Sequence, residues 1–311
     1  LVKKKLKTIR LGGIAISIGV LLTFSISLIF LKDQDQIFNL ISILLGALSF
    51  FILGIIDDFL ELGAIQRLLI ECLIALLLVH YNFEINGLMI SPNKNLFFIE
   101  MPHILNYLLP ILWIVGFTNA INWIDGIDGL AGGVTIILST HLALISFGLQ
   151  NYPLTILLSC LIGSCISFLV FNKYPSKIIM GDGGSHFIGF LISASSMLIF
   201  LDTNQLNSSN NQNILYLTPE MIVIFLPILE MLQVIIFRML NKFPIIYGDR
   251  RHLHYRLIDL GNSEKKACII ILTIYVFFSG ISLLPFSKVI AFGYFFALIP
   301  IFIRKITLIK N

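Results

Sequence analysis

Carboxylate and amide side chains gather at a few positions of a chain that is otherwise largely apolar. Asp57 and Asp58 are adjacent, and Asp182 stands in the glycine-rich segment 180–185. Carboxylates suit Mg²⁺, which takes few protein oxygens and completes its shell with phosphate and water. A glycine-rich turn that opens a helix offers free backbone N–H groups to a phosphate. The segment around Asp182 therefore predicts a site for magnesium and a phosphorylated ligand.

The segment 119–133 carries the densest polar pattern of the chain. Asn119, Asn122, Asp125 and Asp128 recur every three residues, and glycines lie among and after them. In a regular α-helix this ladder drifts around the axis, so the four side chains cannot all face one site. Glycines relieve the conflict because they let the backbone turn and let a ligand approach closely. Asn122 and Asp125 form a candidate pair for a hard cation.

A basic loop near residue 250 combines arginines with histidines. Arg250 and Arg251 are followed by His252 and His254. Arginines and protonated histidines could face a magnesium-bound diphosphate. Zinc is not expected, because no Cys or third His stands nearby. A simple basic flank of a membrane helix remains the alternative for this loop.

Structural interpretations of the other features also stay open. An Asp at a membrane interface is commonly a solvated loop charge, and the turn at Asp182 could be only the start of a helix. His141 and His186 are expected to pack or cap. The cysteines stand in apolar runs without metal-ligand spacing and are expected to be small buried hydrophobes. They are Cys72, Cys160, Cys165 and Cys268.

The composition indicates that membrane-spanning helices position these side chains. The chain has 311 residues, is 57% hydrophobic and 12% charged, and has a mean hydropathy of +0.95. Soluble domains carry roughly a quarter charged residues. The apolar runs are about 20 residues long and lack strand-like alternation, so we expect an all-α, polytopic integral membrane protein. About ten spans are predicted, at 11–31, 37–56, 64–81, 104–122, 131–149, 154–171, 184–201, 217–240, 266–283 and 286–303.

The basic residues predict how these spans are oriented. Eighteen of the 21 Lys and Arg residues fall on one side of the predicted membrane, and only Lys32, Lys94 and Lys288 fall on the other. The basic side should be cytoplasmic, with both termini and the acidic loops on it. We expect one transmembrane domain over 1–311 in the cell inner (plasma) membrane, with no internal repeat and no nucleic-acid partner.

Five ordered motifs resemble a known family, the polyprenyl-phosphate N-acetylhexosamine-1-phosphate transferases of glycosyltransferase family 4. They lie at 10–13, 54–58, 119–133, 171–185 and 249–254. The resemblance runs from about residue 8 to residue 265. The histidine-containing loop is similar to that of the branch that uses UDP-N-acetylglucosamine.

The resemblance implies an enzyme of the EC 2.7.8 type. Such an enzyme transfers a sugar-1-phosphate, here N-acetylglucosamine-1-phosphate, from a UDP-sugar to polyprenyl phosphate, releases UMP and initiates cell-envelope polysaccharide assembly. Phospho-N-acetylmuramoyl-pentapeptide transferase is the second candidate. From other classes, a membrane transporter and an inactive scaffold remain. The polar groups gather at one membrane face rather than at the midplane, which argues against a transporter.

The resemblance also implies roles for individual residues. Asp182 and Asn122 would hold Mg²⁺, for which Mn²⁺ could substitute. Asn119, Gly181, Arg250 and Arg251 would bind the donor. The catalytic group would comprise Asp57, Asp58, Asp125, Asp128, His252 and His254. Asp57 or Asp58 would take a proton or orient the lipid phosphate, and a covalent aspartyl route is the alternative.

Some positions depart from the family pattern. Arg67 stands where Lys is usual, Glu71 replaces Gln, Glu230 replaces Asp, and Tyr255 replaces a third His. Tyr255 cannot carry a positive charge at neutral pH, so these changes bear on the donor sugar more than on the reaction. The family's first helix is expected to have no counterpart here, and a homodimer is an open expectation.

Overall fold

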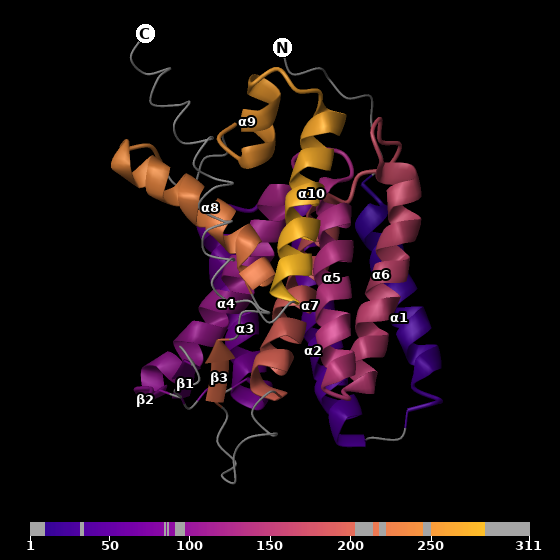
Figure 1. Ribbon diagram of the computed structural model, residues 1–311, viewed down its shortest axis with the longest axis vertical. Helices are drawn as coiled ribbons and strands as arrows, with labels where there is room; N and C mark the ends of the chain where they lie inside the picture. The colour runs from indigo at the N-terminus through magenta and orange to yellow at the C-terminus, as the bar shows by residue number, and fades with distance from the viewer. Residues whose placement is uncertain are drawn as a thin grey trace.

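The computed structural model describes residues 10–31, 34–83, 85, 87–90, 97–202, 214–217, 222–244 and 250–283. Within these residues the protein is a bundle of helices that run mostly along one axis (Figure 1). The helices are α1 (Gly12–Ser27), α2 (Gln34–Leu60), α3 (Ala64–Asn82), α4 (His103–Ile124), α5 (Leu130–Gly148), α6 (Tyr152–Asn172), α7 (Gly181–Asp202), α8 (Ile222–Leu240), α9 (Leu253–Asp259) and α10 (Glu264–Ser282). The predicted all-α class is confirmed.

Nine of the ten predicted spans coincide with helices to within a few residues. The tenth, at 286–303, lies outside the described residues. Seven described helices are long and apolar enough to cross a membrane, which supports a multi-pass membrane protein. The helix α1 is shorter, with 16 residues. The number of ten spans stays a prediction.

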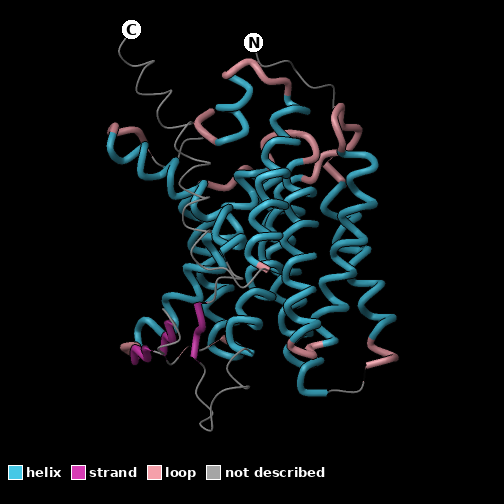
Figure 2. The backbone as a smooth tube through the Cα atoms, viewed as in Figure 1, coloured by secondary structure: helices cyan, strands magenta, loops and turns pink. Residues whose placement is uncertain are grey.

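The described residues also include three short β-strands, which the sequence analysis did not predict. They are β1 (Gly87–Ile90), β2 (Phe97–Glu100) and β3 (Ile214–Leu217). The sheet order is β2-β1-β3, with β1 antiparallel to β2 and parallel to β3. The sheet lies at the end of the bundle opposite to α9 (Figure 2). Because each strand has only four residues, the sheet does not alter the fold class.

The helix α7 is the core of the bundle. Of its most apolar 18-residue window, 94% is buried inside the protein, the largest share among the candidate spans. It packs against α2 and α4 most extensively and also against α1 and α5. This helix carries Asp182 in its first turn, so the packing of its neighbours fixes where that carboxylate lies.

Glycines allow two helices to approach the start of α7 very closely. A Cβ at Gly54 of α2 would lie well under 3.0 Å from the carbonyl of Asp182, and one at Gly13 of α1 would collide with Gly184. Real Cβ atoms do not approach other atoms so closely, so only glycine fits at these contacts. The Asp182 turn is therefore enclosed by backbone on two sides.

The first turn of α1 is also bonded to the segment before α7. The amide of Gly12 donates to the carbonyl of Ile179 at 3.0 Å, and the amide of Gly13 donates to that of Met180 at 2.9 Å. The first amides of a helix have no partner within the helix. Here these two find their partners in the loop that leads to Asp182.

Candidate active site

The first turn of α7 is held by the carboxylate of Asp58. The Asp58 Oδ2 atom accepts hydrogen bonds from the amide of Asp182 at 2.9 Å and from that of Gly183 at 3.4 Å. Gly181 has a φ of +77°, which favours glycine, and a Cβ there would lie 2.9 Å from Asp58 Oδ2. Asp58 thus acts as an N-terminal cap supplied by another helix, a position that favours negative charge.

Arg10 neutralises the other oxygen of Asp58. The Arg10 Nη1 atom donates to Asp58 Oδ1 at 2.7 Å, and the carboxylate of Asp58 is 13% exposed. Both oxygens of Asp58 are therefore engaged by protein groups.

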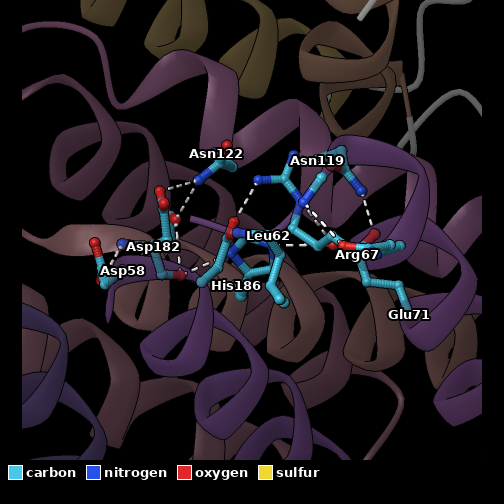
Figure 3. Close-up of polar contacts among 12 residues, drawn as sticks. Asp58, Leu62, Arg67, Glu71, Asn119, Asn122, Asp182 and His186 are labelled. Carbon is cyan, nitrogen blue, oxygen red and sulfur yellow. Dashed lines mark hydrogen bonds and ion pairs between the residues drawn. The ribbon is translucent and has the colours of Figure 1, made fainter. Parts of the chain in front are cut away.

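Asn122 reaches Asp182 from the end of α4. Its Nδ2 donates to Asp182 Oδ1 at 2.8 Å and to Ser185 Oγ at 2.9 Å (Figure 3). The amide nitrogen is thereby committed to these two acceptors. The side-chain oxygen of Asn122 is the atom left for a cation.

The adjacent Asp57 has a different environment from Asp58. Its Oδ2 pairs with Arg67 Nη1 at 2.7 Å, and its Oδ1 accepts from the amide of Leu62 at 2.9 Å. Asp57 is buried, and it closes the turn between α2 and α3. The two adjacent carboxylates thus face different partners, because neighbours on a helix point about 100° apart.

A cavity of about 260 Å³ opens beside Asp182. Four of its ten lining residues are aspartates, and one is an arginine. The lining residues are Arg10, Asp58, Asp125, Gly126, Ile127, Asp128, Asn172, Ile179, Gly181 and Asp182. The structure thus brings together five of the twelve predicted site residues: Asp58, Asp125, Asp128, Gly181 and Asp182.

Asp128 and Asn172 join the two loops that frame this cavity. Asp128 Oδ2 accepts from the amide of Ser176 at 3.0 Å. Asn172 accepts from the amide of Gly129 at 2.9 Å and donates to the carbonyl of Ile178 at 2.8 Å. Asp128 therefore shapes the cavity wall as well as contributing charge to it.

Charge is not balanced evenly around the cavity. Asp58 has Arg10 as its cationic partner, and Asp57 has Arg67. Among the residues that the structure describes, no Lys, Arg or His side chain forms an ion pair with Asp182. A half-buried carboxylate that makes no ion pair with the described residues is suited to bind a cation from solution.

Asn119 belongs to a network below the cavity rather than to its lining. Its Nδ2 donates to Glu71 Oε2 and to the carbonyl of Val115, and its Oδ1 accepts from Arg67 Nη2 at 3.4 Å. Asn119 is 6% exposed. A direct contact between this residue and the donor stays a prediction.

The predicted histidine loop contains a short helix, α9, that packs beside the end of α4. His252 lies edge-on to Trp123 with ring centroids 5.2 Å apart, and His254 stacks on His252 at 5.6 Å. His254 is fully buried, and its ring occupies the space that a Cβ on Gly126 would take; Gly126 lines the cavity. The histidine pair therefore adjoins the cavity wall without lining it.

Burial changes the chemistry available to His254. Burial, with the nearby charges of His252 and Arg250, lowers the pKa of His254 to about 3. Burial therefore disfavours a protonated His254, and its role at a diphosphate stays a prediction. A neutral imidazole packed against Gly126 can still help to shape the cavity wall.

The two arginines of this loop contact neighbouring side chains of their own. Arg250 pairs with Asp259 at 3.4 Å and lies over the ring of Tyr255 at 5.0 Å. Arg251 lies over the ring of Phe243 at 4.1 Å. Neither arginine lines the cavity, so their binding to the donor stays a prediction. Asp249, which belongs to the same motif, lies outside the described residues.

Comparison with known proteins agrees with this site. The sequence profile described as glycosyl transferase family 4 matches residues 40–200, just over half of the chain. The chain belongs to glycosyl transferase family 4.

Relatives in this family have related names. The chain is 33% identical, over 96% of its length and 78% of the relative's, to a probable undecaprenyl-phosphate N-acetylglucosaminyl 1-phosphate transferase of Bacillus subtilis. It is 29% identical to a decaprenyl-phosphate N-acetylglucosaminephosphotransferase of Mycobacterium leprae, over 85% and 70% of the two chains. It is 30% identical to a phospho-N-acetylmuramoyl-pentapeptide-transferase of Caldicellulosiruptor bescii, over 86% and 79%.

The side chains around the cavity of this family 4 protein suit a magnesium ion. Within the described part of the chain, no group of three or more His, Cys, Asp and Glu side chains could hold a metal by itself. Magnesium does not need one, because it retains waters and takes few protein ligands beside phosphate. The carboxylate of Asp182, which makes no ion pair with the described residues, and the side-chain oxygen of Asn122 therefore fit Mg²⁺ better than zinc.

Some residues around this site were not predicted to take part. Arg10 lies in a recognised motif but was given no role, and Glu71 was noted only as a departure. His186 was expected to pack or cap, yet it contacts both Glu71 and the backbone of Asp182. The sequence could have pointed to Glu71 and His186 in one way. Ionisable residues are rare within apolar helices and need a partner there.

Proposed function

We propose that this chain transfers N-acetylglucosamine-1-phosphate from UDP-N-acetylglucosamine to a polyprenyl phosphate. The products are the polyprenyl-diphosphate sugar and UMP, at the start of cell-envelope polysaccharide assembly. The names of the relatives from Bacillus subtilis and Mycobacterium leprae support this reaction. The observation that carries the proposal is the Asp182 carboxylate, which lines an acidic cavity without a cationic partner among the described residues.

The proposed enzyme depends on Mg²⁺, with Mn²⁺ as a substitute. Asp182 and the side-chain oxygen of Asn122 would hold the ion. When bound, the ion would neutralise charge on the donor diphosphate and make the sugar-side phosphorus more electrophilic. The hydrogen bond from Asn122 Nδ2 to Asp182 Oδ1 supports this assignment, since it fixes the two ligand groups relative to each other.

Positioning is the main task left to the protein in a phosphoryl transfer. A phosphate monoester has a second pKa near 6, so the lipid phosphate is already largely a dianion at about pH 7. A strong base is therefore not needed. Arg10 is the basic residue in the lining of the cavity, and it could therefore orient an anion there.

Asp58 is proposed to act by orientation rather than as a nucleophile. One of its oxygens is bound by Arg10 and the other by the amides of Asp182 and Gly183. A carboxylate engaged at both oxygens is a poor nucleophile, which disfavours the covalent aspartyl route. Its loss would instead loosen both Arg10 and the first turn of α7.

The test is a transfer assay with the purified protein in detergent or nanodiscs. Polyprenyl phosphate, MgCl₂ and UDP-N-acetylglucosamine labelled in the sugar should yield label that extracts with the lipid, together with UMP. Omission of the divalent cation should abolish the product. Failure to form lipid-linked product from any UDP-sugar would overturn the proposal, and flux of solute across vesicles without lipid product would favour a transporter.

A second candidate is supported by the relative from Caldicellulosiruptor bescii, which is 30% identical. That relative is named for transfer of phospho-N-acetylmuramoyl-pentapeptide. The same assay with UDP-N-acetylmuramoyl-pentapeptide as the competing donor decides between the two. We expect the smaller donor to be preferred by at least about tenfold in kcat/KM, a modest discrimination for a binding pocket.

We further propose that the cavity faces the cytoplasm in the inner (plasma) membrane, with both termini on that side and with a homodimer as the assembled state. The distribution of Lys and Arg residues supports the orientation. Mass measurement of the protein in nanodiscs tests the homodimer.

A further inference from the structure

Glu230 connects α8 to the short helix that follows the histidine motif. It is the acidic residue of α8 and is half-buried. Its Oε1 atom accepts a hydrogen bond from the amide of Leu253 at 3.0 Å, and Leu253 is the first residue of α9. The first amides of a helix have no partner within the helix, and the side chain just before the helix commonly supplies one. Here the acceptor comes from another helix, 23 residues earlier in the chain.

The helix α9 depends on such contacts for its position. It has seven residues, and helices shorter than about 12 residues are marginal in water without support. An ionisable side chain within a membrane span likewise needs a partner. Arg256, one turn after Leu253, lies close enough to Glu230 for an electrostatic interaction between the two side chains. Glu230 therefore meets α9 through a backbone donor and a basic side chain.

The start of α9 also contacts the end of α4 and the cavity wall. The ring of His252 lies edge-on to Trp123, with 5.2 Å between the centroids. The ring of His254 occupies the space that a Cβ on Gly126 would take. The Tyr255 hydroxyl donates to the carbonyl of Gly126 at 3.4 Å. A displacement of α9 would therefore be felt at Gly126, which lines the cavity.

We propose that Glu230 positions α9 against the end of α4 and thereby fixes the cavity wall at Gly126. Asp125 and Asp128 line the cavity on either side of Gly126, so the wall that α9 supports carries two of the four cavity aspartates. Glu230 acts on them through α9, and its role is positioning. The inference rests on the proposed function in taking this cavity as the site of transfer.

Three variants of α8 test the acceptor of this hydrogen bond. Glu230→Leu removes the oxygen that accepts from Leu253. Glu230→Gln is the conservative variant, because its amide oxygen can still accept from the same N–H. Gln233→Leu is the matched control, since it also replaces a polar side chain of α8 by leucine, about one turn from Glu230.

Two variants of α9 test the donor, and they keep the proposal testable if Glu230→Leu does not fold. Leu253→Pro removes the N–H and leaves the carboxylate in place. Proline suits the first position of a helix, and His252 before it has φ −61° and ψ 151°, a conformation that a residue before proline adopts readily. Leu253→Ala is the control, because it shortens the side chain and keeps the N–H. Glu230→Leu and Leu253→Pro are called the disrupting variants.

The first measurement is hydrogen exchange of the α9 amides, which needs no turnover. In the disrupting variants, the amides of residues 256–260 should exchange about tenfold faster, as expected for loss of a hydrogen bond that supports the helix. The conservative variant and both controls should stay within about twofold of the unsubstituted protein. The double variant should exchange no faster than either disrupting variant, because both remove the same bond. Unchanged exchange in both disrupting variants would overturn the proposal.

The second measurement follows Trp123, which packs against His252. The chain has two tryptophans, so 5-fluorotryptophan should give two ¹⁹F signals, and Trp113→Phe assigns them. The disrupting variants should shift the signal of Trp123 and leave that of Trp113 in place. If Trp123 keeps its signal while α9 exchanges faster, α9 frays in place and Glu230 does not position it.

The third measurement separates this inference from the proposed function. In the transfer assay, the disrupting variants should lower kcat/KM for UDP-N-acetylglucosamine by about 10- to 100-fold, since small displacements in an active site are costly. The Mg²⁺ concentration for half-maximal rate should stay within about twofold, because the described contacts of α9 with the cavity are at Gly126. Glu230→Gln should retain most of the rate.

The outcomes of this assay are distinct. Normal transfer by variants in which α9 is displaced would overturn its role in the cavity wall. If the unsubstituted protein forms no lipid-linked product while the exchange and ¹⁹F results hold, the proposed function fails and the positioning of α9 by Glu230 stands.

Discussion

At the scale of residues, the site is a set of acids that differ in how their charge is balanced. Asp57 and Asp58 each have an arginine partner, whereas Asp182 forms no ion pair with the described residues and accepts a hydrogen bond from the amide of Asn122. Identical side chains thus acquire different chemistry from their neighbours. A carboxylate such as Asp182, which makes no ion pair with the described residues, is suited to bind a cation from solution.

Replacing this carboxylate should therefore abolish metal-dependent transfer. Asp182→Asn keeps the size of the side chain and can still contact Asn122, so the protein should fold and insert. Transfer at saturating MgCl₂ should fall by about 100-fold or more, because the charged oxygen is lost. Glu264→Gln, a carboxylate-to-amide change in α10, is the control, and near-normal turnover of Asp182→Asn would remove the metal assignment.

The buried imidazole of His254 should make stability depend on pH. Its pKa is lowered from 6.5 to about 3 in the folded protein. Between about pH 6.5 and pH 3, the unfolded chain therefore binds a proton at this residue and the folded protein does not. Stability should fall as the pH drops from about 6.5 toward 3, by up to about 1.4 kcal/mol per pH unit, and His254 should contribute no slope above that window. Thermal unfolding of His254→Gln between pH 4 and 8 checks this, and an identical acid slope in the variant would contradict it.

At the scale of elements, close approach between helix backbones positions the first turn of α7. Gly54 of α2 faces the carbonyl of Asp182, and Gly13 of α1 faces Gly184. Neither contact involves a side chain that could shift out of the way. The geometry of the site is therefore sensitive to a single methyl group placed at these crossings.

Gly54→Ala tests this sensitivity. The added Cβ would push on the carbonyl of Asp182, so we expect a loss of stability of about 1–3 kcal/mol and a larger proportional loss of transfer. Gly163→Ala in α6 is the matched control, since a Cβ there meets nothing within 4 Å. If both substitutions had the same small effect on transfer, the contact between Gly54 and Asp182 would accommodate a Cβ, and the prediction would be wrong.

The sequence predicted the helices well and the contacts between them less well. Apolar runs of about 20 residues identify spans because length and hydropathy are local properties. The strands β1, β2 and β3 were missed because four residues carry too little pattern, and α9 was missed because it lies in a polar loop. Asp182 and Asn122 were paired through their motifs, whereas Glu71 and His186 lie 115 residues apart, and only the packing of α3 on its neighbours brings them together.

At the scale of the whole molecule, the acidic cavity is confined to one end of the helix bundle. Asp58, Asp125, Asp128 and Asp182 line one cavity, whose Gly126 packs against His254 of α9. The helix α9 and the three-stranded sheet lie at opposite ends of the bundle (Figure 1). Donor and lipid phosphate could therefore both reach the cavity from one membrane surface. In this arrangement, neither the donor nor the lipid phosphate would need to cross the bilayer to reach the cavity.

Cysteine labelling of the protein in sealed vesicles tests the orientation. In a chain with its native cysteines replaced by Ser, Lys173→Cys in the loop after α6 should react with a membrane-impermeant maleimide only from the cytoplasmic side. Gln150→Cys, in the turn between α5 and α6, should react only from the opposite side. Both residues are exposed, so the reverse pattern would overturn the predicted topology.

The two amide bonds from the start of α1 to residues 179 and 180 have a practical consequence. They make the beginning of the described chain part of the framework that supports Asp182, together with the guanidinium of Arg10. Trimming the protein past residue 13, or fusing a bulky carrier directly before Arg10, would disturb catalysis from a place that looks peripheral in the sequence. Purification handles for this enzyme should be separated from Arg10 by a flexible spacer.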